Sequence, residues 1–225
     1  MKNLFAILFV FLTVSHLGMT QNFDVRPMSC KLKGAVFAPA FWKDKLVVCS
    51  DQKDRIYKTI KDKHDQEPVD LYVIDPSNSD SIAAFDELFK TDYHDGPITF
   101  DTSGTFAVVS RNLLTELKFK YMEVTNNHLG LYTSTYKDGQ WTSLAPLPFN
   151  DTAYNCTHPC LNEKGNILYF ASNMPGGQGG YDLYKTELID GRWGRPINLG
   201  PEINSADHEV FPSFDNGQIY FSSNR

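Results

Sequence analysis

The chain has 225 residues and a formal net charge of −6. This acidic balance argues against binding to nucleic acid or to an anionic membrane surface, because both attract basic proteins. Aromatic residues make up 13% of the chain, as expected of a strand-rich domain that carries Tyr and Phe on its sheets.

The first 21 residues have the features of a secretory signal peptide. Lys2 supplies a positive charge, residues 4–14 are apolar, and a polar stretch begins at Gln21. The apolar run is too short to span a bilayer, although an uncleaved membrane anchor is the alternative interpretation. We therefore predict an exported protein with a signal peptide over 1–21, a lead-in over 22–33 and no transmembrane segment in the mature chain.

One pattern recurs along the rest of the chain. A turn glycine is followed by a short run of β-branched and aromatic residues at Gly104, Gly165 and Gly217, and a fainter copy lies at 45–50. The first two copies align without a gap. A repeat that rebuilds the same strand at such a period is typical of a propeller or a solenoid.

The repeating unit extends beyond this strand. A second common strand carries Tyr72, Tyr132 and Tyr184 at equivalent places, and Asp-Gly and Asn-Gly turns separate the strands. Short strands divided in this way indicate antiparallel meanders. The sequence predicts an all-β fold, an incomplete antiparallel β-propeller with about three and a half blades. The predicted units are 34–92, 93–153, 154–206 and a partial 207–225.

The chain stops within a predicted strand at Arg225. We therefore expect it to be truncated, because each unit of a propeller buries its face only against its neighbours and three units do not close a ring. Alone, such a fragment is expected to expose unpaired sheet edges and to aggregate or open.

A resemblance to a known repeat supports this interpretation. Residues 158–184 resemble the PD40 repeat, a WD40-like unit shared with the TolB propeller. Residues 193–204, 209–212 and 220–224 are similar to OmpA-family envelope proteins of Bacteroidetes, including those associated with type IX secretion. The resemblance implies a periplasmic, outer-membrane-associated propeller. It also implies envelope proteins as partners, and peptidoglycan held by a C-terminal domain that this sequence lacks.

Three histidines are the candidate ligand-facing residues. His94, His158 and His208 fall near the starts of successive units and could line one mouth of a propeller. Because they recur with the repeat, a structural role is the alternative.

Several other residues are expected to serve the repeat itself. Asp182 precedes a strand, and we interpret it as an acceptor for loop N–H groups, with a bound cation as the alternative. The segment 175–180 is rich in glycine but leads into a strand without the Lys of a phosphate loop, so we expect a tight structural loop. The residues assigned structural roles are Gly104, Gly165, Gly217, Asp70, Asp182, Tyr72, Tyr132, Tyr184, Pro159 and Pro212.

The cysteines suggest a local disulfide rather than a metal site. Cys156 and Cys160 could pair in an exported chain, or remain free thiols. With His158 they could form a metal site, but the spacing does not fit a zinc knuckle. Four cysteines allow three pairings, and the sequence does not choose among them.

No catalytic motif is present. The chain lacks the Gly-x-Ser-x-Gly turn of a serine hydrolase, so we predict no enzyme, cofactor or metal. The leading hypothesis is a non-catalytic envelope scaffold. The alternatives are a free exported propeller that binds a glycan or peptide at its mouth, and the propeller of a serine peptidase.

Overall fold

A computed structural model describes residues 31–52, 68–113 and 127–225. The predicted signal peptide and most of the lead-in lie outside these ranges. Strands and turns make up the described residues, apart from one short 3-10 helix, η1 (Glu87–Phe89).

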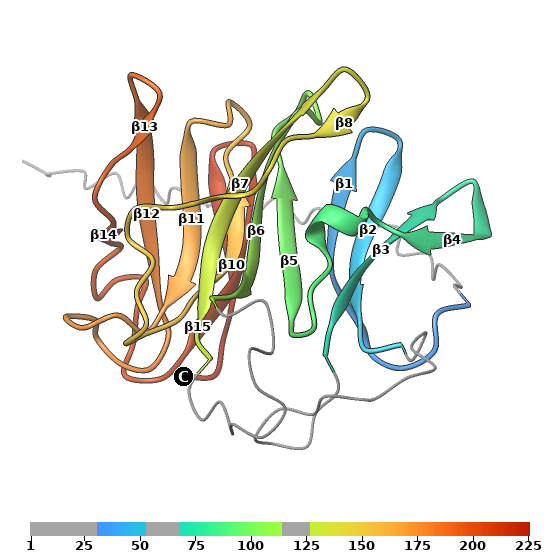
Figure 1. Cartoon of the computed structure of the whole chain (residues 1–225). Coiled ribbons are helices and arrows are strands. Elements are labelled where there is room, and N and C mark those ends of the chain that lie inside the picture. Colours follow the sequence, from blue (N-terminus) through green and yellow to red (C-terminus); the bar gives the residue numbers. More distant parts are fainter. Residues whose placement is uncertain (1–30, 53–67, 114–126) are drawn as a thin grey trace, which may run out of the picture.

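The strands form four antiparallel sheets, each built from consecutive strands (Figure 1). The first contains β1 (Val36–Trp42), β2 (Lys45–Ser50), β3 (Asp70–Asp75) and β4 (Asn78–Ala84). The second contains β5 (Asp95–Phe100), β6 (Phe106–Asn112), β7 (Leu129–Lys137), β8 (Gln140–Trp141) and β9 (Ala145–Pro146). The third contains β10 (Cys156–Leu161), β11 (Ile167–Ser172), β12 (Asp182–Ile189), β13 (Arg192–Trp193) and β14 (Ile197–Asn198). The fourth contains β15 (Glu209–Asp215) and β16 (Gln218–Ser223).

The sheets follow one another so that their first strands are neighbours. β5 packs beside β1 and β10, and β10 packs beside β15. Figure 1 shows the first three sheets side by side in the order of the chain, with the fourth sheet partly hidden behind β10. This is the arrangement of an antiparallel β-propeller, here with three complete sheets and a two-stranded fourth. The predicted fold class is confirmed.

The hydrophobic core lies in the seams between sheets. Successive residues of a strand point to opposite faces, so each second strand serves two seams. Val109 packs in the seam between the first and second sheets with Cys49 and Leu71. Val108 packs in the next seam with Phe170.

The hairpins between first and second strands explain the recurring glycines. Gly104, Gly165 and Gly217 have φ values of 64°, 68° and 77°, a region that favours glycine. Asp101 accepts backbone N–H bonds from Thr105 and Phe106 after the first of these turns. Asn162 accepts the N–H groups of Asn166 and Ile167 after the second turn in the same way, so a turn glycine and a side chain that binds the turn define these two hairpins.

Each first strand also contains a bulge. The pairing with the second strand shifts within β1, β5, β10 and β15. In all four a residue with positive φ precedes a proline. These pairs are Ala38-Pro39, Gly96-Pro97, His158-Pro159 and Phe211-Pro212.

Candidate functional site

The residue just before β5, β10 or β15 binds the sheet that precedes that strand. His94 Nδ1 accepts the N–H of Val69 at 3.3 Å, and His208 Nδ1 accepts the N–H of Tyr181 at 3.0 Å. In both cases the donor precedes the third strand of the preceding sheet. His94 and His208 are therefore equivalent and hold the seams.

Asn155 has the same role in the seam between the second and third sheets. Its Oδ1 accepts the N–H of Leu129 at 2.8 Å. We call His94, Asn155 and His208 the seam clamps. An amide replaces imidazole at the middle seam, so the clamp requires an acceptor and not a titratable ring.

The seam clamps also bind within their own sheets. The backbone N–H groups of His94, Asn155 and His208 donate to side-chain oxygens at the ends of the second strands. The acceptors are Asn112, Asn173 and Asn224, at 2.9, 2.7 and 2.9 Å.

His158 does not share this position. It lies within β10 at the bulge, with φ 51°, and its ring centroid is 3.8 Å from that of Phe211 in β15. Burial lowers its pKa to about 4, so the ring is neutral at pH 7. The structure therefore separates His158 from the two clamp histidines by role, where the sequence grouped all three.

Two buried carboxylates are the first residues of the first strands in the second and fourth sheets. Asp95 and Glu209 are both fully buried. Each accepts hydrogen bonds from the backbone N–H and the hydroxyl of the residue four positions earlier, Thr91 or Ser205. The sequence signal is a Ser/Thr followed by His-Asp or His-Glu at fixed spacing, which recurs in two units and which sequence reasoning missed.

The two carboxylates differ in their remaining contacts. Glu209 Oε1 also accepts the hydroxyl of Ser223 at 2.7 Å. Burial raises its pKa, but the bonds from Ser205 and Ser223 outweigh burial and leave the pKa below its usual value. Burial raises the pKa of Asp95 to about 7, and the bonds from Thr91 only partly oppose it.

Asp182 fastens the glycine-rich loop. Its Oδ2 accepts the N–H of Gln178 at 2.6 Å and the Nδ2 of Asn198 at 2.7 Å, and its Oδ1 accepts the N–H of Gly179 at 3.2 Å. A Cβ at Gly179 would overlap the backbone of Ala206. The loop is thus held by a carboxylate and packed against a neighbouring connection.

The three equivalent tyrosines pair with equivalent residues of the second strands, although their surroundings differ. The pairs are Tyr72 with Val48, Tyr132 with Val109 and Tyr184 with Phe170. Tyr72 and Tyr184 are buried and Tyr132 is half-buried. The guanidinium of Arg111 lies 5.5 Å from the Tyr132 ring.

The candidate disulfide is not present. Within the described part of the chain, Cys156 and Cys160 are free and buried. Cys156 contacts the hydroxyl of Ser172, while Cys160 contacts the carbonyl of Leu161. Four residues of regular strand span about 13 Å, beyond the ~7 Å Cα separation that a disulfide bridges, and the bulge does not bring these two sulfurs together.

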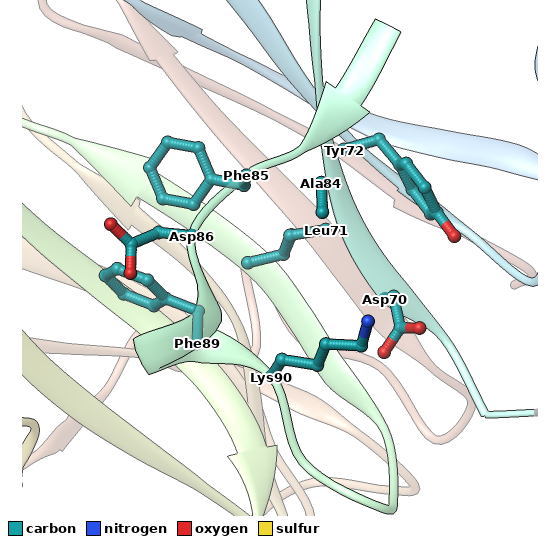
Figure 2. A pocket seen from close by; sticks show the side chains of 8 residues that line it. All are labelled: Asp70, Leu71, Tyr72, Ala84, Phe85, Asp86, Phe89 and Lys90. Atoms are coloured by element: carbon teal, nitrogen blue, oxygen red, sulfur yellow. The ribbon is translucent and has the colours of Figure 1, made fainter. Parts of the chain in front are cut away.

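A small pocket lies beside η1, between the end of the first sheet and the connection to the second (Figure 2). Leu71 and Phe89 form its apolar part, and Lys90 extends toward Asp70 at its rim. Its full lining is Asp70, Leu71, Tyr72, Ala84, Phe85, Asp86, Phe89 and Lys90.

The described residues offer neither a metal-binding cluster nor a membrane-spanning helix. No group of three or more His, Cys, Asp or Glu residues among them is arranged to hold a metal ion. In the same residues no helix has the length and apolar character needed to cross a membrane.

Comparison with known proteins gives structural similarities alone. No protein-family model and no curated protein matches the sequence. TolB from Acinetobacter baumannii is 12% identical, with a TM-score of 0.48 over 85% of this chain and 40% of TolB. A structure from a study of two prolyl endopeptidases is 14% identical, with a TM-score of 0.42 over 83% of this chain and 24% of that one. This chain thus spans less than half of either protein, and such similarities say nothing about activity.

Proposed function

We propose that this chain is a non-catalytic interaction propeller of the cell envelope. In this proposal the protein is exported to the periplasm and associates with the outer membrane. It belongs to a longer OmpA-family protein whose further domain binds peptidoglycan, and it serves a secretion machinery of the type IX kind. The location, the family and these partners rest on the sequence resemblance, and the repeat boundaries 34–92, 93–153, 154–206 and 207–225 are part of the same proposal.

The observation that carries the proposal is that the recurring polar side chains form structural hydrogen bonds within the propeller. The connections and seams between sheets are held by bonds to His94, His208, Asp182 and Glu209. What remains for recognition is a surface of turns and connections on a rigid support, the usual place for protein contacts.

The test is capture of envelope proteins by the purified chain through an introduced photo-crosslinker. The crosslinker is placed at Lys90, on the pocket rim, and in a control at the exposed turn residue Asp190. The proposal expects one specific adduct from Lys90 and none from Asp190. It also expects the native protein, but not this chain alone, to sediment with purified peptidoglycan. No adduct at Lys90, or equal adducts at both sites, would count against the scaffold.

A second candidate function is binding of a glycan or peptide at the propeller mouth. Phe211 favours it, because this ring is 40% exposed and packs against His158 on neighbouring first strands. Aromatic faces of this kind bind sugar rings and peptide side chains. Retention of the chain on immobilised glycans, weakened by Phe211→Ala but not by Phe41→Ala, would support this function.

A further inference from the structure

Arg111 stands where the other sheets carry a small side chain. In the pairing of first and second strands, Arg111 lies opposite Asp95. The equivalent residues in the other three described sheets are serines, Ser50, Ser172 and Ser223. The propeller therefore needs only a small polar residue at this place, and the arginine calls for another explanation.

The contact between Arg111 and Asp95 is incomplete. Arg111 Nε lies 3.8 Å from Asp95 Oδ1, and the two side chains are 11% and 1% exposed. Both atoms are buried, and neither has a hydrogen-bond partner among the described residues. A buried ion pair without hydrogen bonds leaves much of the cost of desolvation uncompensated. Glu209 shows the completed arrangement, since Ser223 donates to it from the position that Arg111 occupies.

The surroundings of Asp95 favour its protonated form. Burial is the largest cause of the raised pKa of Asp95, and the Asp70 carboxylate of β3 raises this pKa further. The hydrogen bonds from Thr91 and the charge of Arg111 lower it. Cys49 of β2 faces it as a protonated thiol, because burial raises the pKa of that thiol to about 12. The connection to the first sheet adds Asp92, Tyr93 and His94 close by in sequence.

We propose that Asp95 and Arg111 form a proton-operated switch in the seam between the first and second sheets. When Asp95 is ionised, its carboxylate holds the guanidinium in the seam beside Tyr132. When Asp95 takes up a proton, Arg111 is left as an unpaired charge in a buried place, which is strongly unfavourable. Its side chain already reaches solvent, so a change of rotamer carries the guanidinium out to the surface at the ends of β6 and β7.

The test measures the exposure of Arg111 as a function of pH. The chain is treated with phenylglyoxal, and modification of Arg111 is read by mass spectrometry relative to the exposed Arg192, which corrects for the pH dependence of the reagent. All proteins also carry His94→Asn, the residue that the next sheet uses as its clamp, so that the response does not depend on the imidazole beside Asp95. We expect the Arg111/Arg192 ratio to rise several-fold from pH 8 to pH 6.

Two variants identify the titrating group. Asp95→Asn removes the counter-charge, so the ratio should be high and independent of pH. Glu209→Gln alters the equivalent carboxylate of the fourth sheet and should keep the pH response. An unchanged ratio between pH 6 and pH 8, or a response that survives Asp95→Asn, would overturn the switch. If Asp95→Asn does not fold, the ¹⁵Nε chemical shift of Arg111 decides instead, since the proposal requires this shift to change as Asp95 takes up its proton, and a shift that is constant between pH 6 and pH 8 would overturn the switch.

Discussion

The imidazole of His158 lies against the phenyl ring of Phe211, with the ring centroids 3.8 Å apart, and this contact joins the first strands of the third and fourth sheets. The two residues have φ values of 51° and 52° and each precedes a proline. The same backbone bulge, repeated in neighbouring sheets, therefore brings two aromatic side chains together. The contact requires a neutral imidazole, because burial disfavours the charged form.

Stability should fall in acid through His158. The folded pKa is about 4, below the ordinary value of 6.5, so the unfolded chain binds this proton first. The contribution of neutral His158 to the free energy of unfolding is complete above pH 6.5 and is lost as the pH falls toward 4. This loss amounts to at most about 3 kcal/mol. Urea unfolding at pH 7.5 and pH 4.5 measures it. His158→Asn, which tolerates positive φ and does not titrate, should lose less stability than the wild type over this interval. Equal losses would contradict the assignment.

Phe170 should be among the most costly residues to truncate. Its ring is fully buried and stacks on Phe149 and Tyr184 at centroid distances of 5.1 and 5.9 Å. Phe170→Ala leaves a cavity in the seam and should lower the free energy of unfolding by about 3–5 kcal/mol. The matched control is Phe41→Ala, because Phe41 is 75% exposed and should change stability by less than about 0.5 kcal/mol. Denaturant unfolding measures both variants: with the m-value unchanged, the midpoint should fall clearly for Phe170→Ala and hardly at all for Phe41→Ala.

The hairpin glycines make a prediction about backbone conformation. Gly165 has φ 68°, so Gly165→Ala should destabilise the chain by about 1–2 kcal/mol. Gly165→Asn should recover part of that loss, because Asn tolerates the left-handed region better than Ala. In thermal unfolding, the midpoint temperature should be highest for the wild type, lower for Gly165→Asn and lowest for Gly165→Ala. If Ala matches Gly, the turn can adopt another conformation.

The anchor of the glycine-rich loop can be tested by hydrogen exchange. Asp182→Asn replaces one acceptor oxygen by an N–H donor facing the donors of Gln178 and Asn198, and should cost about 1–3 kcal/mol. The amides of Gln178 and Gly179 should exchange faster in this variant. The exposed turn variant Asp190→Asn serves as control and should leave their protection unchanged.

The buried thiols should resist alkylation. Burial raises the pKa of Cys156 to about 12 and that of Cys160 to about 11, and only the thiolate reacts. Iodoacetamide at pH 8 should therefore label neither residue in the native chain and both in urea, as read by peptide mass spectrometry. Rapid labelling of native Cys156 would show that the seam between the second and third sheets opens readily.

The sequence was sufficient to predict the propeller because strands and turns are encoded locally. Gly165 and the apolar run after it specify a hairpin without reference to any other sheet. The seam contacts were not predictable in this way, because His94 binds Val69 and Asn155 binds Leu129 only after the sheets have packed. His158 was grouped with the clamp histidines because it also precedes a strand proline.

The position of each histidine relative to its strand explains why His158 differs from His94 and His208. His94 and His208 come one residue before their first strands, whereas His158 lies inside β10 at the bulge. Arg111 was missed for a related reason, since its partner Asp95 is identified only by strand pairing. The repeat of the second strands already places Asn112, Asn173 and Asn224 together in the sequence. It does not show that these side chains accept the N–H groups of the seam clamps, because that contact forms only when the first strand pairs with the second.

The confinement of the strand ladders to single sheets bears on how this fold can change over evolutionary time. The ladders close within each described sheet, whereas the seams are joined by interlocking side chains, a clamp residue and a few single hydrogen bonds. Two of these bonds run from the N–H of Asp95 to the carbonyl of Val69 (2.8 Å) and from the N–H of Glu209 to the carbonyl of Tyr181 (2.7 Å). A whole unit can thus be duplicated or lost without breaking a ladder elsewhere, provided that the new neighbours offer complementary faces and an acceptor before the first strand. Individual units can then differ from one another, as they do at position 111, where this sheet carries arginine and the other described sheets carry serine.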